Sequence, residues 1–79
     1  METHEMKVLA EVGAVSAVEA LPESDGWTLW ITRAIKSGER REPLERQRGG
    51  PRVFATLEAA AHTVASAGLR EFRVIVKPQ

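Results

Sequence analysis

The amino-acid sequence predicts a small α+β domain, in which an antiparallel sheet of three to four strands carries a helix packed on it. The expected order of elements is helix, two or three strands, helix, strand. Three observations support this fold. Residues 27–34 are rich in aromatic and β-branched side chains, residues 57–67 have apolar side chains at helical spacing, and strand-like segments follow one another along the chain. At 79 residues the chain is expected to form a single domain, residues 1–79.

A short helix is expected first, over residues 4–12. Thr3 is a suitable N-cap, because its hydroxyl can accept a hydrogen bond from a free backbone N–H of the first turn. Met6 and Leu9 share one face of this helix. Gly13 is expected to end it, and a helix this short needs tertiary packing to persist.

A β-hairpin is expected next. Its first strand, near residues 15–21, alternates imperfectly between apolar and polar side chains, and its alanines leave a helix as the alternative. Residues 22–26 are typical of a turn, because proline presets φ, aspartate bonds its own backbone and glycine tolerates a positive φ. The second strand covers residues 27–34.

This second strand places large apolar side chains on both of its faces. The side chains expected to face the core are Trp27, Leu29 and Ile31. Trp30 then lies on the opposite face, and so does Ile75 of the last strand. If their strands are neighbours, Trp30 and Ile75 form an exposed apolar patch with Val18, which is typical of a partner surface. The alternative is that the N-terminal helix covers this patch.

Residues 36–51 are expected to form a flexible, arginine-rich hairpin or arm. Residues 36–39 are typical of a turn, and residues 40–48 fit either a polar third strand or a mobile arm. The Gly-Gly-Pro that follows interrupts regular structure. Val53 or Phe54 is expected to be buried after it.

The clearest helix begins after Thr56, which is its expected N-cap. Gly68 is expected to end it, with Leu69 in hydrophobic contact. The helix has one apolar stripe, formed by Leu57, Ala60, Ala61, Val64 and Ala65. A strand closes the chain, and its expected inward side chains are Phe72, Val74 and Val76.

Charge is unevenly distributed along a chain whose formal net charge is zero. Residues 1–25 carry −5 and residues 26–52 carry +4. The two halves can therefore pair with each other, or the basic half can attract a polyanion. The absence of cysteine excludes disulfides and thiolate zinc sites. Because so small a domain buries little surface, a homodimer is expected as the source of further buried area.

Catalytic and metal-binding motifs are absent from the sequence. The serines lie in no nucleophile-elbow pattern, there is no phosphate-binding loop, and His4 and His62 have no suitably spaced partner. The sequence therefore predicts no enzyme activity, no cofactor and no metal. The acidic N-terminal stretch does not resemble a signal peptide, and charge-free runs such as residues 26–32 are too short to span a membrane. A cytoplasmic protein is expected.

The stretch "ERREPLERQRGGPR", residues 39–52 and here called the arginine-rich segment, is the main candidate for binding. Arginine forks match phosphates with two hydrogen bonds. Three interleaved glutamates instead indicate a surface that compensates its own charge, and the lack of aromatic residues disfavours stacking on single-stranded nucleic acid. The candidate partner- or DNA-binding residues are Arg40, Arg41, Arg46, Arg48, Arg52 and Trp30.

Two stretches, "RGGPRVFATLEAAA" and "GLREFRV", carry a family resemblance. Across roughly residues 10–76 the chain resembles the small ParC-type proteins encoded beside partition genes on bacterial plasmids and integrated elements. The resemblance implies an accessory protein of plasmid maintenance that works with a ParA-like ATPase and a centromere-binding protein. It carries over no catalytic residues.

The sequence therefore predicts a non-catalytic accessory protein of plasmid partition or of a mobile element, which acts through protein–protein contacts. Its binding surface is expected to be an apolar sheet face or an exposed strand edge, with the arginines adding electrostatic attraction. The alternative is a small DNA-binding module that uses the arginine-rich segment. An enzyme subunit or an antitoxin-like regulator is a further alternative.

Overall fold

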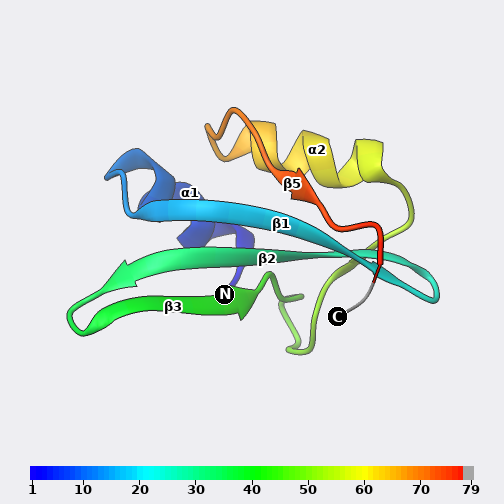
Figure 1. Cartoon of the computed structure of the whole chain (residues 1–79), viewed down its shortest axis with the longest axis horizontal. Helices are drawn as coiled ribbons and strands as arrows, with labels where there is room; N and C mark the ends of the chain where they lie inside the picture. The colour runs from blue at the N-terminus through cyan, green and yellow to red at the C-terminus, as the bar shows by residue number, and fades with distance from the viewer. Residues whose placement is uncertain (78–79) are drawn as a thin grey trace.

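The computed structural model describes residues 1–77, which contain two helices and five strands (Figure 1). In chain order the elements are α1 (Thr3–Glu11), β1 (Val15–Glu23), β2 (Gly26–Ile35), β3 (Gly38–Pro43), β4 (Val53–Phe54), α2 (Leu57–Ser66) and β5 (Arg73–Val74). The predicted α+β class is confirmed. The predicted order is confirmed as well, with β4 as an additional strand of two residues.

The strands form one mixed sheet in the order β3-β2-β1-β5, and β4 also pairs with β2. β1 and β2 are antiparallel, as are β2 and β3. β5 pairs with β1 in parallel, which departs from the antiparallel sheet predicted. The reason lies in the path of the chain. β4 runs antiparallel to β2, hence in the direction of β1, and α2 carries the chain back before β5 begins.

Both helices pack on the same face of the sheet. Alternate residues of β1 and β2 point to this face, and Val18, Leu29 and Ile31 are buried there. Met6 of α1 and Val64 of α2 belong to the same hydrophobic cluster. The predicted inward orientation of Leu29 and Ile31 is confirmed. The other face of the sheet carries no helix in the described chain, and Figure 1 is viewed from that side, with β1 in front of α1.

α1 begins one residue earlier than predicted. Its N-cap is Glu2 rather than Thr3, and the backbone N–H of Glu2 donates to a side-chain oxygen of Glu5 at 3.4 Å. The hydroxyl of Thr3 instead accepts a hydrogen bond from Arg52 at 3.4 Å. The predicted stop at Gly13 is confirmed, since this glycine has a φ of +71° just beyond the helix.

α2 has the caps that the sequence predicts. The hydroxyl of Thr56 accepts a hydrogen bond from the N–H of Ala59 at 3.1 Å. At the other end Gly68 has a φ of +89°, and the N–H of Leu69 donates to the backbone oxygen of Val64 at 3.3 Å. This is the glycine-terminated motif that satisfies the last carbonyls of a helix.

Three positions predicted to be apolar and inward are exposed. Ala65 faces solvent, and Thr63 is buried in its place on α2. Val76 is 81% exposed, because β5 ends at Val74 and the chain then leaves the sheet. Val74 itself is partly exposed at the sheet edge. Phe72 packs against the core as predicted.

Residues 36–51, expected as one flexible hairpin or arm, fall into three parts. β3 accounts for Gly38–Pro43, so the strand alternative is confirmed there. Leu44 is fully buried, and its N–H donates to a backbone oxygen of β2 at 2.8 Å. The rest forms a turn, closed by the N–H of Arg46, which donates to the backbone oxygen of Gly50 at 3.1 Å. The segment is therefore joined to the core at Leu44.

Candidate interaction surface

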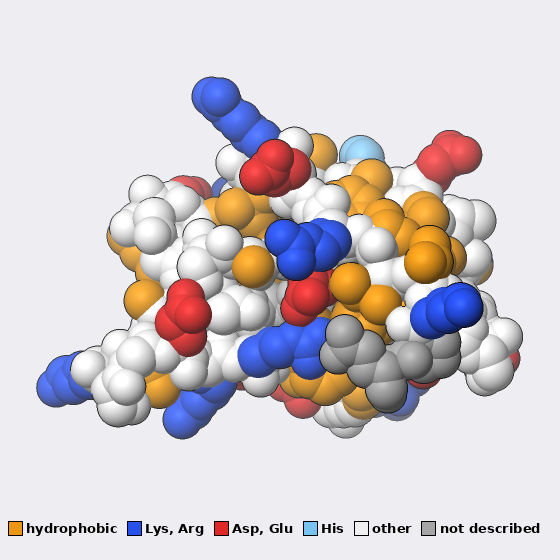
Figure 2. All heavy atoms as spheres, viewed as in Figure 1, with side chains coloured by type: hydrophobic (Ala, Val, Ile, Leu, Met, Phe, Trp, Pro, Cys, Tyr) orange, Lys and Arg blue, Asp and Glu red, His pale blue; other side chains and the backbone are white. Residues whose placement is uncertain are grey.

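The sheet face that points away from both helices, here called the open face, is the candidate interaction surface (Figure 2). Its side chains alternate along each strand with those that point to the core. The central residues of the open face are Glu19 on β1, Thr28 and Trp30 on β2, and Glu39 and Arg41 on β3.

Trp30 is held in one orientation on the open face. Its half-buried ring lies beneath the guanidinium of Arg41, whose Cζ is 4.8 Å from the ring centroid. Its indole N–H donates to the hydroxyl of Thr28 at 3.2 Å, and this hydroxyl donates to Glu23 at 3.1 Å. Thr28 is 2% exposed, so water competes little for its hydrogen bonds. Trp30 is predictable from strand alternation, whereas Thr28 and Glu23 carry no local signal for this role.

Arg41 connects β3 with β1 across the face of β2. Its Nε donates to the Oε1 of Glu19 at 2.9 Å. A cation over a partly exposed tryptophan contributes about 0.5–1 kcal/mol, and a partly exposed ion pair about 0.2–1 kcal/mol. Within residues 1–77, this is the one ion pair between a carboxylate of residues 1–25 and an arginine of residues 26–52. The predicted pairing of the two charged halves is therefore confined to Arg41.

The predicted apolar patch of Trp30, Ile75 and Val18 is wrong. β1 lies between β2 and β5, so the residue beside Trp30 on β1 is Glu19. Val18 is buried and points to the helices. The alternative cover is wrong too, because α1 packs Met6 into the core on the other face. The ring of Trp30 is covered instead by a charged side chain from β3.

The arginines of the arginine-rich segment lie in separate places. Arg52 is half-buried, and its Cζ lies 4.6 Å from the ring centroid of Phe54. Arg40 is exposed on the helix side of β3, whereas Arg46 and Arg48 are exposed in the turn that follows. On the face shown in Figure 2, basic side chains are separated by acidic and uncharged ones. The predicted candidates therefore form no single basic surface in the described chain.

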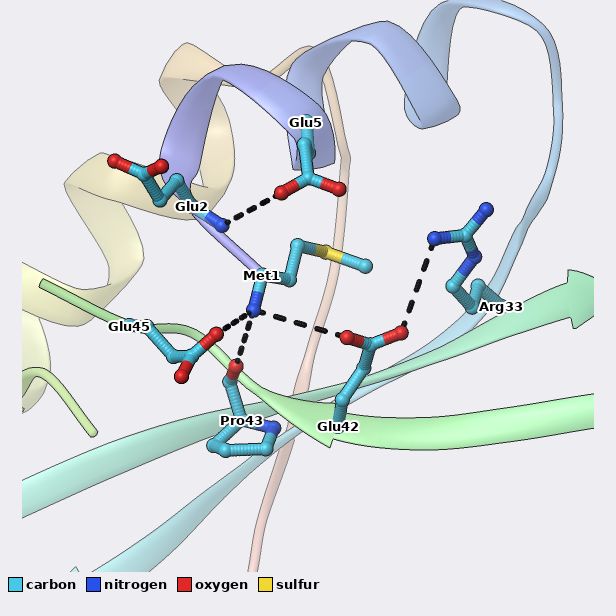
Figure 3. A network of polar contacts seen from close by, with 7 residues as sticks. All are labelled: Met1, Glu2, Glu5, Arg33, Glu42, Pro43 and Glu45. Atoms are coloured by element: carbon cyan, nitrogen blue, oxygen red, sulfur yellow. Dashed lines mark hydrogen bonds and ion pairs between the residues drawn. The ribbon is translucent and has the colours of Figure 1, made fainter. Parts of the chain in front are cut away.

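Two glutamates of the arginine-rich segment hold the first residue of the chain (Figure 3). The ammonium group of Met1 contacts the carboxylates of Glu45 and Glu42, the latter at 3.7 Å, and donates to the backbone oxygen of Pro43 at 3.3 Å. Arg33 lies 3.8 Å from the second oxygen of Glu42. The N–H of Glu45 donates to the backbone oxygen of Met1. Met1 thus lies along the sheet edge where β3 ends.

Within residues 1–77, no three His, Cys, Asp or Glu side chains are grouped to hold a metal ion, and His62 is exposed on α2. No helix of that stretch is long and apolar enough to cross a membrane. Comparison of the chain with protein-family models, curated proteins and solved structures finds no match. The resemblance to ParC-type proteins therefore stays a prediction.

Proposed function

We propose that the protein is a non-catalytic interaction protein of plasmid partition or of a mobile element, which acts in the cytoplasm through protein–protein contacts. The observation that carries this proposal is the oriented Trp30 with Arg41 stacked on it, on a sheet face without a covering helix in the described chain. The resemblance noted in the sequence suggests a ParA-like ATPase or a centromere-binding protein as the partner.

Tryptophan and arginine are enriched among the residues that dominate the binding energy of protein interfaces. On the open face the two are adjacent, and the hydrogen bond to Thr28 orients the indole before any partner arrives. A side chain that is already ordered loses little conformational entropy when it is bound. Trp30 is therefore suited to act as the central anchor of an interface, with Arg41 as the polar contact beside it.

Binding at the open face is expected to change the fluorescence of Trp30. The Trp27→Phe variant leaves Trp30 as the single tryptophan of the chain, so its emission maximum can be followed while a purified ParA-like ATPase is added. We expect a shift to shorter wavelength as the ring loses contact with water. The Trp30→Ala substitution should weaken the affinity about 30-fold, the loss typical of an interface hot spot.

Val12→Ala serves as the control, because Val12 is exposed at the end of α1, outside the open face. This variant should bind like the wild type. A Trp30→Ala protein that keeps its circular dichroism spectrum and also keeps wild-type affinity for both candidate partners contradicts the proposal.

DNA binding is the second candidate function, favoured by the exposure of Arg40, Arg46 and Arg48. None of the three forms an ion pair with another residue of the described chain. Arg41 and Arg52 weigh less here, because contacts within the protein already occupy their guanidinium groups. The basic side chains available to phosphates are therefore fewer than the sequence suggests.

The DNA-binding candidate predicts a salt-dependent gel shift with DNA of the native partition locus. Replacing both Arg46 and Arg48 with glutamine should reduce the slope of log affinity against log salt by about 2, since each lost phosphate contact removes about 0.9. Lys36→Gln, at the opposite end of β3, is the matched control. Absence of any shift at about 50 mM salt rules out this function.

A further inference from the structure

We propose that a second copy of this chain pairs with the free edge of β3, so that two sheets join into one continuous sheet. The pairing is antiparallel, and its two-fold axis passes through Arg40 perpendicular to the sheet. This inference specifies the edge and the register of a homodimer, and it does not depend on the partner proposed above. It follows from the backbone groups of β3, the limits of its free edge and its charge pattern.

The backbone groups that point outward from β3 belong to Glu39 and Arg41. The N–H of Leu44 donates to β2, and residues of an antiparallel strand alternate between the neighbouring strand and the outside. Counting back from Leu44 in steps of two, Glu42, Arg40 and Gly38 bond to β2. The positions between them point outward. The outward oxygen of Pro43 fits this alternation, since it accepts from the ammonium group of Met1 at 3.3 Å.

Within residues 1–77 no strand pairs with the outer edge of β3 over Gly38–Glu42, and this stretch is called the free edge. At one end the chain turns back at residues 36–37 into β2. At the other end Pro43 has no N–H, and Met1 takes its oxygen. The middle of this free stretch is Arg40. A two-fold axis through Arg40 therefore uses the whole free edge. The β3 strand of the second copy begins at its Gly38, opposite Glu42, and so does not extend as far as Met1.

In this register Glu39 lies opposite Arg41 of the second copy, and the symmetry repeats the pair. Each is a hydrogen-bonded pair that exchanges two backbone bonds, so the two pairs supply about four hydrogen bonds between the chains. A slip of one residue would place the open faces of the two copies on opposite sides. A slip of two residues would place Glu39 opposite Glu39 of the second copy, or Arg41 opposite Arg41 of the second copy. The register through Arg40 therefore combines the most backbone bonds with opposite charges.

The open face carries the opposite charges that this register pairs. Arg41 uses its Nε for Glu19, and Glu39 uses its Oε2 for Ser16 at 2.6 Å. Both side chains therefore lean from β3 across β2 toward β1, and the terminal nitrogens of Arg41 and the Oε1 of Glu39 meet the partner pair by turning back toward the edge. On the helix side Arg40 faces Arg40 of the second copy, which is the unfavourable contact of this register. Charged edge strands disfavour pairing with most other edges, whereas this alternation accepts its own copy.

The contact is small, so the association is expected to be weak. Five paired residues bury less than the roughly 1,000 Å² that stable interfaces need, which places the dissociation constant between about 10 µM and 1 mM. Because the axis is perpendicular to the sheet, both open faces point to the same side. The dimer therefore presents two copies of Trp30 and Arg41 on one continuous surface.

Sedimentation velocity over about 10 µM to 2 mM protein, the range around the expected dissociation constant, tests the pairing. The Glu39→Arg chain brings two like-charged pairs together and should dimerise at least about tenfold more weakly, and so should the Arg41→Glu chain. An equal mixture of the two variants should associate with near wild-type affinity, because a heterodimer restores both opposite-charge pairs. Arg40→Thr removes the unfavourable contact and should tighten the dimer.

Two further variants keep the test decisive if Arg41→Glu fails to fold. Glu39→Pro removes an outward N–H without touching the bonds to β2 and should weaken the dimer. Arg48→Glu changes charge in the turn, away from the edge, and should dimerise like the wild type. A wild-type chain that stays monomeric at 2 mM overturns the proposal, and so does a folded Glu39→Arg chain that dimerises like the wild type or a variant mixture that associates no better than its components.

Discussion

Replacing Leu44 with alanine is expected to lower the free energy of unfolding by about 2–5 kcal/mol. Leu44 is one of the largest fully buried side chains, although it lies between Pro43 and Glu45 in the arginine-rich segment. The substitution removes its apolar contacts with the core and leaves a cavity that the rigid sheet cannot close. A domain of this size has a total stability of about 4–12 kcal/mol, so the loss is a large share of it.

Urea unfolding followed by circular dichroism measures this loss. Gln47→Ala is the matched control, because Gln47 is exposed three positions further along the same segment, and it should change stability by less than about 0.5 kcal/mol. Equal midpoints for the two variants would show that the segment is not joined to the core through Leu44.

Replacing Gly26 with alanine is expected to destabilise the protein by more than about 3 kcal/mol. Gly26 begins β2 with a φ of +147°, a conformation that side-chain-bearing residues rarely adopt. A Cβ there would lie 2.0 Å from the backbone oxygen of Phe54. The new methyl group must therefore displace β4 from β2, where Trp27 pairs with Phe54. Loss of this contact should also shift the emission of Trp27 to longer wavelength.

Gly13→Ala separates the two causes of this loss. Gly13 also has a positive φ, +71°, but a Cβ there would meet nothing within 4 Å. Its alanine variant should lose about 1–2 kcal/mol, the cost of the backbone conformation alone. Thermal unfolding of both variants under the same conditions measures the difference. If the two midpoints fall equally, close contact with Phe54 contributes nothing, and the packing of β4 against Gly26 is refuted.

Much of the fold could be predicted from the sequence, because its determinants lie close together in the chain. The alternation of Leu29 and Ile31 predicts which face of β2 is buried, and the structure confirms it. Thr56 and Gly68 predict both ends of α2, since capping hydrogen bonds reach only three to five residues. Trp30 was likewise predictable as the aromatic side chain on the opposite face.

The role of the arginine-rich segment could not be predicted in the same way. Its local pattern is polar, and one buried leucine among charged residues gives no periodic signal. Leu44 is buried because the end of β3 lies beside a buried part of β2. Which residue reaches that place depends on the register between the two strands. Similarly, the sequence suggests that Glu42 and Glu45 compensate the arginines of their own segment. The structure instead shows both in contact with Met1, and Glu42 also beside Arg33 of β2.

By itself, the sequence determined the class of the fold, the two caps of α2 and the two-faced character of β2. The tertiary structure alone decided that β5 joins β1 in parallel and that Arg41 covers Trp30 and reaches Glu19. It also decided that no other strand of the described residues 1–77 pairs with the outer edge of β3 between the hairpin turn and Met1. Periodicity and capping act between residues a few positions apart. Strand neighbours, by contrast, meet across long stretches of sequence, so their contacts follow from the path of the whole chain.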